Sequence, residues 1–317
     1  MEGRVALFTD AGMDVHAAPG HPERPDRRKA AASGVRDGAG DRLAEPAVDA
    51  ATDEELAAIH EPRYLAMLDE AEALGGGWLD PDTYLVPGSM GAARLAAGAT
   101  VQAARAIAAG EAVVAFAAVR PPGHHAASAR GTGFCLLNNV AVAVAALRSD
   151  GSATRVAIVD WDVHHGDGTQ AIFDADPDVI YASTHEAPFY PGTGHPDDRG
   201  TGTALGTMLN RPLAAGDGDE PFVTTWREEL LPAIEAFAPD AVLVSAGYDA
   251  HRDDPLAHLT VTEPGYGAVA HALGRVSARL GLAGVALTLE GGYDLDAVRG
   301  SIAATVRGIL VGRSDPG

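Results

Sequence analysis

The sequence is poor in cysteine, lysine, aromatic residues and long hydrophobic runs. Its 317 residues include one cysteine, Cys135, which excludes an internal disulfide and any zinc cluster built from cysteines. The one lysine, Lys29, among many arginines indicates a nucleotide bias of the source genome. Arg, Gln or Gly interrupts every Ala-rich stretch, and the apolar start is too short for a signal peptide. We therefore expect a cytoplasmic protein without a membrane partner.

Positive charge is also scarce, because the formal net charge is −21. This balance argues against a nucleic-acid partner, which needs a basic face. It favours cationic substrates, although an acidic surface that merely aids solubility explains it equally well. The hydrophobic share of 46% allows a large core. Length alone suggests two domains of about 150 residues, but we expect one domain over residues 1–317, because distant segments contribute to one candidate site.

From residue 113 onward, short apolar strands alternate with helical patterns. This alternation predicts an α/β fold in which helices cover both faces of a central parallel sheet. We expect strands at 5–8, 113–119, 156–159, 179–182, 241–246 and 285–289. We expect helices at 90–109, 139–147, 222–237, 265–280 and 302–310, and a long loop from 184 to about 218.

Each apolar strand after residue 113 is followed by unusual polar residues. These segments are Arg120–His125, Asp160–His165, Ser183–His185, Ser245–Asp249 and Glu290–Asp294. In open α/β sheets, sites form in the crevice at the carboxyl ends of the strands. The pattern therefore predicts one site to which five strand ends contribute.

Three of these residues form a candidate metal site. Asp162 and His164 are two positions apart, so in an extended backbone their side chains point the same way. Asp249, beside a glycine that permits close approach, is the best third ligand. Two Asp and one His leave coordination positions open, which is typical of a catalytic zinc site, although iron or cobalt would also suit. The competing interpretation is a solvated strand end.

The tandem pair His124-His125 is a candidate for general acid and base catalysis. Asp160 and Asp167 are spare carboxylates beside the metal segment, and they could orient the two imidazoles. Tyr293, after two glycines, could donate its hydroxyl to a developing oxyanion. A structural histidine pair and an ordinary loop tyrosine are the alternatives.

Four sequence motifs that contain these candidate residues together resemble motifs of the zinc-dependent histone deacetylase superfamily. The superfamily includes bacterial deacetylase-like amidohydrolases and acetylpolyamine amidohydrolases, and the likeness is greatest to its class II branch. It runs from His21 to the last helix. The motifs begin at Arg120 (RPPGHH), Asp160 (DWDVHHGDGT), Ser245 (SAGYDAHRDDP) and Leu289 (LEGGY).

The resemblance implies the arginase/deacetylase fold as a single domain. It implies one Zn²⁺ bound by Asp162, His164 and Asp249, and an amide hydrolysed by attack of a metal-bound water. The catalytic groups that it implies are a His124–Asp160 pair, a His125–Asp167 pair in which His125 is the base, and Tyr293 polarising the carbonyl.

The resemblance also implies residues that contact the substrate or a monovalent cation. Gly133, Phe134 and Tyr190 would line a narrow acyl-amide channel, Leu256 would lie at its rim, and Asp82 would accept a hydrogen bond from the substrate. K⁺ or Na⁺ would be held by backbone carbonyls of Asp160, Asp162 and His164 with Ser183 and Thr184, and a second ion by Phe173, Asp176 and Val179.

The chain departs from the family pattern at three of these positions. Asp167 stands where class II members often have Asn, and Tyr190 replaces a common Phe. Leu256 is apolar, whereas polyamine-selective eukaryotic relatives have an acidic gatekeeper there.

We expect a deacetylase that removes acetyl or other acyl groups from N-acetylated lysine, in a peptide or small molecule, or from similar amines. An acetylpolyamine or small N-acyl-amine amidohydrolase is the first alternative. A binuclear manganese ureohydrolase and a non-catalytic acetyl-lysine-binding protein are the others. The sequence predicts no oligomeric state.

Overall fold

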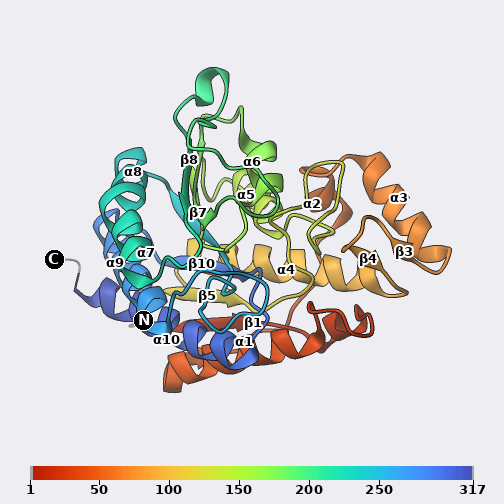
Figure 1. Ribbon diagram of the computed structural model, residues 1–317, viewed down its shortest axis with the longest axis horizontal. Helices are drawn as coiled ribbons and strands as arrows, with labels where there is room; N and C mark the ends of the chain where they lie inside the picture. Colours follow the sequence, from red (N-terminus) through yellow and green to blue (C-terminus); the bar gives the residue numbers. More distant parts are fainter. Residues whose placement is uncertain (1–2, 316–317) are drawn as a thin grey trace.

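A parallel sheet of eight strands forms the centre of the computed structural model, which describes residues 3–315 (Figure 1). The strand order is β2-β1-β5-β10-β9-β6-β7-β8. Its strands are β1 (Val5–Phe8), β2 (Leu43–Ala44), β5 (Val114–Ala117), β6 (Val156–Asp160), β7 (Val179–Glu186), β8 (Met208–Leu213), β9 (Ala241–Ala246) and β10 (Val285–Leu289). A separate hairpin pairs β3 (Gly77–Trp78) with β4 (Tyr84–Leu85).

Helices cover both faces of this sheet. In Figure 1, α4 lies on one side of β1 and β5, and α1 and α10 lie together on the other side. The helices are α1 (Pro25–Ala39), α2 (Asp53–Ala57), α3 (Pro62–Ala73), α4 (Ser89–Ala108), α5 (Asn139–Ser149), α6 (Asp167–Phe173), α7 (Asp219–Thr225), α8 (Leu231–Phe237), α9 (Glu263–Arg279) and α10 (Leu295–Ser314). A π-helical turn at Trp226–Leu230 joins α7 to α8.

Local sequence explains where several of these elements begin. The central strands are wholly buried and almost continuously apolar, as expected for a parallel sheet with both faces covered. The side chain of Asn138 accepts a hydrogen bond from the Ala141 amide and begins α5, and Asp294 does the same for Ala297 at the start of α10. Thr52 and Glu55 form a capping box at α2.

Glycines allow the helices on one face to touch backbone to backbone. A Cβ atom at Gly308 of α10 would lie 2.5 Å from the Gly267 carbonyl oxygen of α9, and one at Gly312 would lie 2.1 Å from that of His271. On α1, a Cβ atom at Gly34 would lie 2.5 Å from the carbonyl oxygen of Arg299 in α10. These three helices therefore pack at a spacing that only glycine permits.

The expected long loop from 184 to about 218 is wrong in part. Strand β7 continues to Glu186, and β8 adds an edge strand to the sheet within that segment. Strand β8 carries Asn210, Arg211 and Pro212, which weaken its strand signal, but an edge strand tolerates proline because one side needs no ladder bonds. Helix α6 and the β3–β4 hairpin were not anticipated either.

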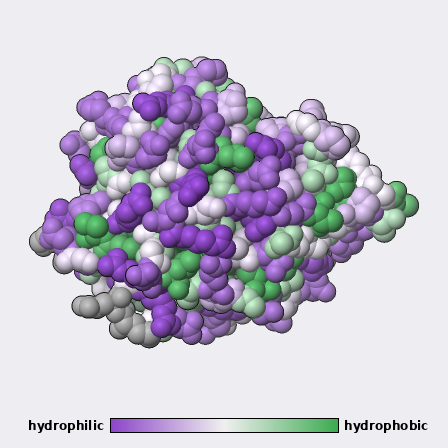
Figure 2. All heavy atoms as spheres, turned by 90° about the horizontal axis from the view of Figure 1, so that it is seen from below, coloured by the Kyte–Doolittle hydropathy of each residue, from purple (hydrophilic) through white to green (hydrophobic). Residues whose placement is uncertain are grey.

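The surface agrees with the composition. On the face shown in Figure 2, hydrophilic residues predominate and hydrophobic ones are scattered in small groups. Among the described residues, every helix is too short or too polar to span a lipid bilayer.

Candidate active site

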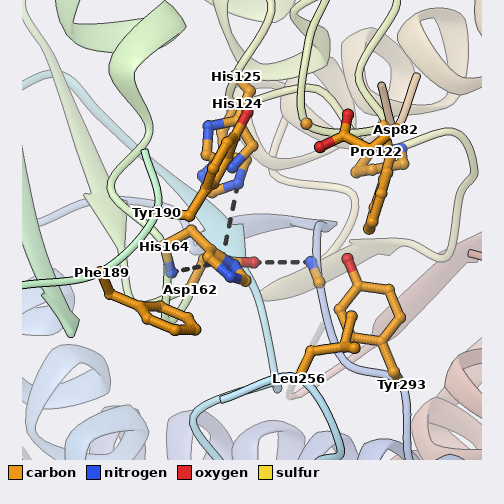
Figure 3. Close-up of a pocket in the computed structure, with 13 residues that line it drawn as sticks. Asp82, Pro122, His124, His125, Asp162, His164, Phe189, Tyr190, Leu256 and Tyr293 are labelled. Carbon is orange, nitrogen blue, oxygen red and sulfur yellow. Dashed lines mark hydrogen bonds and ion pairs between the residues drawn. The ribbon is translucent and has the colours of Figure 1, made fainter. Parts of the chain in front are cut away.

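The five predicted strand ends lie side by side. Strands β5, β10, β9, β6 and β7 are consecutive in the sheet, and all run parallel. The polar segments that follow them therefore meet at one edge, as the sequence predicted. Figure 3 shows the resulting cavity, with side chains from three of these segments, at 120–125, 160–165 and 290–294, lining it.

Asp162 and His164 line this cavity, and Asp249 meets them there. One ligand atom from each lies within 4.8 Å of the others. The His164 Nδ1 atom lies 3.2 Å from Asp162 Oδ1 and 3.3 Å from Asp249 Oδ2. Both carboxylates are fully buried, and Asp249 Oδ2 accepts no hydrogen bond. A buried carboxylate oxygen that accepts no hydrogen bond is costly unless a neighbouring cation, either a protonated imidazole or a metal ion, neutralises it.

The surroundings of these three side chains fit a bound cation. A Cβ atom at Gly247 would lie 2.0 Å from Asp162 Oδ2, and one at Gly291 would lie 1.9 Å from Asp249 Oδ2, so the glycines make room for the carboxylates. Although burial opposes it, the two carboxylates raise the pKa of His164 to about 10. Positive charge is therefore stabilised at this site. A divalent ion would supply that charge in place of the proton on His164.

Two histidine–carboxylate pairs lie beside this triad. The Nδ1 atom of His124 is 3.1 Å from Asp160 Oδ2, and that of His125 is 2.7 Å from Asp167 Oδ1. The centroids of the two rings are 4.1 Å apart. Each carboxylate fixes one ring nitrogen, so the other nitrogen faces the cavity (Figure 3).

The two imidazoles differ in proton affinity. Burial lowers the pKa of His124, but the charges of Asp162 and Asp160 outweigh it and hold that pKa well above 6.5. Burial and the neighbouring His124 lower the pKa of His125 to about 4, despite Asp167. Pairs whose surroundings separate their pKa values can divide acid and base roles.

Tyr293 lies across the cavity from the histidines (Figure 3). Its backbone amide donates to Asp254 Oδ2 at 2.7 Å, and its ring lies 4.7 Å from the Arg27 guanidinium carbon. Burial raises the pKa of Tyr293 well above 10, so the phenol keeps its proton at neutral pH. Its hydroxyl is therefore a hydrogen-bond donor for a group at the metal triad.

The cavity itself has a volume of about 220 Å³. Besides the histidines, Asp162 and Tyr293 described above, all five residues that the resemblance placed along the substrate channel line this cavity. Three further residues also line it. The predicted ones are Asp82, Gly133, Phe134, Tyr190 and Leu256, and the additional ones are Pro122, Phe189 and Gly291.

Several residues of the site were not singled out from the sequence. The ring of Phe189 stacks on His164 at 5.5 Å between centroids. One carboxylate oxygen of Glu290 accepts from the backbone amides of Gly123 and His124 at 2.6 and 3.1 Å. Phe189 directly precedes Tyr190, a predicted channel residue, and Glu290 is a charged residue at the end of an apolar strand, so the sequence offered a signal for both.

The residues predicted to hold monovalent cations also form two groups. Asp160 and Ser183 pair across β6 and β7, next to Thr184, whose hydroxyl accepts a hydrogen bond from Trp226 at 3.0 Å. Phe173 ends α6, Val179 begins β7, and Asp176 lies in the turn between them, where its amide donates to the Phe173 carbonyl at 2.9 Å. Ion binding there stays a prediction.

The fold and this arrangement of side chains define a class of hydrolase, and comparison with known proteins gives the same class. The Histone deacetylase domain family matches residues 21–309, and the chain belongs to that family. The sheet and helices match the solved HDA15 HD domain with a TM-score of 0.90 at 38% identity, covering 97% of this chain and 90% of that one. The arginase/deacetylase fold is therefore confirmed.

Relatives from other organisms are similar over most of their length. A probable deacetylase of Archaeoglobus fulgidus is 40% identical over 96% of this chain and 84% of its own. A histone deacetylase-like amidohydrolase of Pseudomonas aeruginosa is 37% identical over 88% of this chain and 74% of its own. Family membership supports a hydrolase with deacetylase or amidohydrolase activity.

Proposed function

We propose that this protein is a zinc-dependent deacetylase that hydrolyses N-acetyl or other N-acyl amides of lysine or similar amines. The observation that carries the proposal is the meeting of a metal triad, two histidine–carboxylate pairs and a buried tyrosine in one narrow cavity. We also propose that residues 1–317 form one catalytic domain, and that the protein acts in the cytoplasm.

Asp162, His164 and Asp249 would hold the metal ion. When bound, Zn²⁺ lowers the pKa of a water molecule and polarises the acyl carbonyl. The aromatic sides of the cavity, formed by Phe134, Phe189 and Tyr190, would exclude bulk water from this point.

The two histidines would move the protons of the reaction. The neutral His125 would accept a proton from the attacking water at Nε2 as the water oxygen bonds to the acyl carbon. The protonated His124 would deliver a proton from Nε2 to the amine nitrogen as the carbon–nitrogen bond breaks. Water and amide are thereby converted into acetate and a free amine. Tyr293 would donate its hydroxyl to the oxyanion that develops on the carbonyl oxygen.

The proposed substrate is a small molecule or peptide that carries an N-acyl amine. The narrow cavity suits an unbranched alkyl chain between Phe134 and Tyr190, with Leu256 at the rim. A small N-acyl amine such as an acetylpolyamine is the second candidate, and the acidic side chain of Asp82 at the cavity supports it. We propose no nucleic-acid or membrane partner, and K⁺ or Na⁺ as structural ions.

Acetate release from a panel of amides tests this function. The panel contains acetyl-lysine peptides, acetylputrescine, acetylspermidine and a longer-acyl lysine peptide, and D249A is the blank. We expect the zinc-loaded protein to release acetate and D249A to release none. Activity on polyamines alone would favour the second candidate. Tight acetyl-lysine binding without acetate release would replace the proposed hydrolase with a binding protein.

A further inference from the structure

Three side chains form a continuous hydrogen-bonded chain beside the cavity. The hydroxyl oxygen of Tyr190 lies 3.1 Å from Thr132 Oγ1, which lies 2.6 Å from Asp80 Oδ2. Tyr190 lines the cavity, whereas Thr132 and Asp80 are not among the lining residues. The chain therefore links the cavity wall at 190 to two other loops.

The chemistry of these groups fixes the direction of each hydrogen bond. Partial burial raises the pKa of Asp80, but hydrogen bonds from Thr132, Asp82 and Thr83 outweigh it and hold that pKa below its ordinary value. The carboxylate is therefore ionised and can only accept, so Thr132 must donate its single proton to Asp80. Tyr190 must then donate its own proton to Thr132. The oxygen of Tyr190 keeps lone pairs but has no proton left for a ligand.

The Asp80 carboxylate also positions residues on the opposite side of the cavity. Its Oδ1 atom accepts hydrogen bonds from the amides of Asp82 and Thr83 at 3.0 and 2.6 Å. The Thr83 hydroxyl donates to Asp82 Oδ1 at 2.8 Å and accepts from the Phe134 amide at 3.0 Å. Figure 3 shows the Asp82 carboxylate and the Tyr190 ring on opposite sides of the space between them.

We propose that Asp80 and Thr132 are positioning residues that hold the proton of Tyr190 in a hydrogen bond, so that the Tyr190 oxygen and the Asp82 carboxylate face the cavity mouth as hydrogen-bond acceptors. The mouth then selects N-acyl amines that carry a second N–H donor near the acyl chain, such as a free ammonium or a peptide N–H. This substrate class rests on the proposed deacetylase function and narrows it. A neutral alkyl acetamide would fill the same channel but leave both acceptors unpaired.

Phenylalanine, the residue that Tyr190 replaces relative to the family pattern, has no hydroxyl and would provide no such acceptor. The hydroxyl of this chain is therefore a candidate source of selectivity rather than only a wall of the channel. An ammonium satisfies two acceptors at once, since it has three donors, whereas a peptide N–H has one. Hydrogen bonds to charged groups are also the stronger kind, so discrimination should be greatest for a cationic substrate.

The test compares T132V with T132S on two substrates of similar length, acetylputrescine and N-pentylacetamide. The ratio of kcat/KM for the cationic over the neutral substrate should fall about 10-fold in T132V, through KM. T132S retains the relaying hydroxyl and should keep the wild-type ratio. T201V removes an exposed threonine hydroxyl that bonds the Asp174 carbonyl, far along the chain from the cavity, and serves as the matched control.

An equal loss on both substrates in T132V would overturn the proposal, because it would indicate a general loosening of the cavity. An unchanged ratio would overturn it as well. Calorimetric binding of the same two compounds to the metal-free protein gives a readout that needs no turnover. If the zinc-loaded wild type releases no acetate, the deacetylase function fails. A binding preference for acetylputrescine that T132V abolishes would still support the acceptor mouth, and no preference would refute it.

Discussion

Replacing Glu23 by glutamine should destabilise the protein severely. Glu23 lies between Arg27 and Arg120, and all three side chains have 0% exposure. Its Oε1 atom accepts from Arg120 Nε at 2.9 Å and from Arg27 Nη1 at 3.2 Å, and its Oε2 atom accepts a second, short bond from Arg120. E23Q keeps the shape but leaves two buried guanidinium groups without a counter-charge, which costs about 3–5 kcal/mol.

The assay is urea unfolding of wild type and E23Q. We expect a lower midpoint with an unchanged m-value. E45Q is the matched control, because Glu45 also forms a two-fold bond with an arginine, Arg36, but on the surface. That exposed pair should be worth about 0–1 kcal/mol. A loss in E23Q no greater than that in E45Q would refute the reasoning.

The pH dependence of this difference has a definite sign. Burial raises the pKa of Glu23, but the charges of Arg120 and Arg27 outweigh it and hold the pKa below its ordinary value of 4.5. A depressed folded-state pKa contributes stability that is complete above the unfolded value and is lost as the pH falls through the folded value. The advantage of wild type over E23Q should therefore be constant near neutral pH and shrink only below about pH 4.5.

The remaining predictions concern the active site. Y293F should lower the rate of acetate release by about 10²–10³, with zinc content unchanged, because it removes one oxyanion donor; normal turnover would contradict that role. G291A should lower zinc content measured by elemental analysis, since its Cβ atom would lie 1.9 Å from Asp249 Oδ2; full zinc occupancy would show that the carboxylate can move away. Zinc should raise the thermal midpoint of wild type but not of D249A, because ligand binding to the folded state alone stabilises it; an equal shift in both would place the ion elsewhere.

The sequence predicted most of what depends on short-range pattern. The buried strands β5, β6, β9 and β10 are continuous apolar runs, so their positions were evident. The polar residues after them follow directly, because consecutive parallel strands end at the same edge of the sheet. The prediction that Asp162, His164 and Asp249 lie together rested on that rule and on the family resemblance.

The sequence could not predict features that depend on partners distant along the chain. Strand β8 is an edge strand whose polar residues hide its pattern, and only pairing with β7 reveals it. The buried ionic cluster around Glu23 draws on residues from two remote segments, which a local pattern cannot connect. Glu290 belongs to a predicted motif and Phe189 adjoins a predicted channel residue, but their roles depend on which way each side chain points.

The glycine contacts between α1, α9 and α10 limit which glycine substitutions can stabilise this protein. Exchanging a helical glycine for alanine usually stabilises a protein, because it reduces the freedom of the unfolded chain. Here the added methyl group at Gly308 or Gly312 would have to displace a neighbouring helix. Stabilising glycine-to-alanine substitutions should therefore avoid this helix face. They should be made where the added methyl group has space, such as at Gly91, whose Cβ atom would meet no atom within 4 Å.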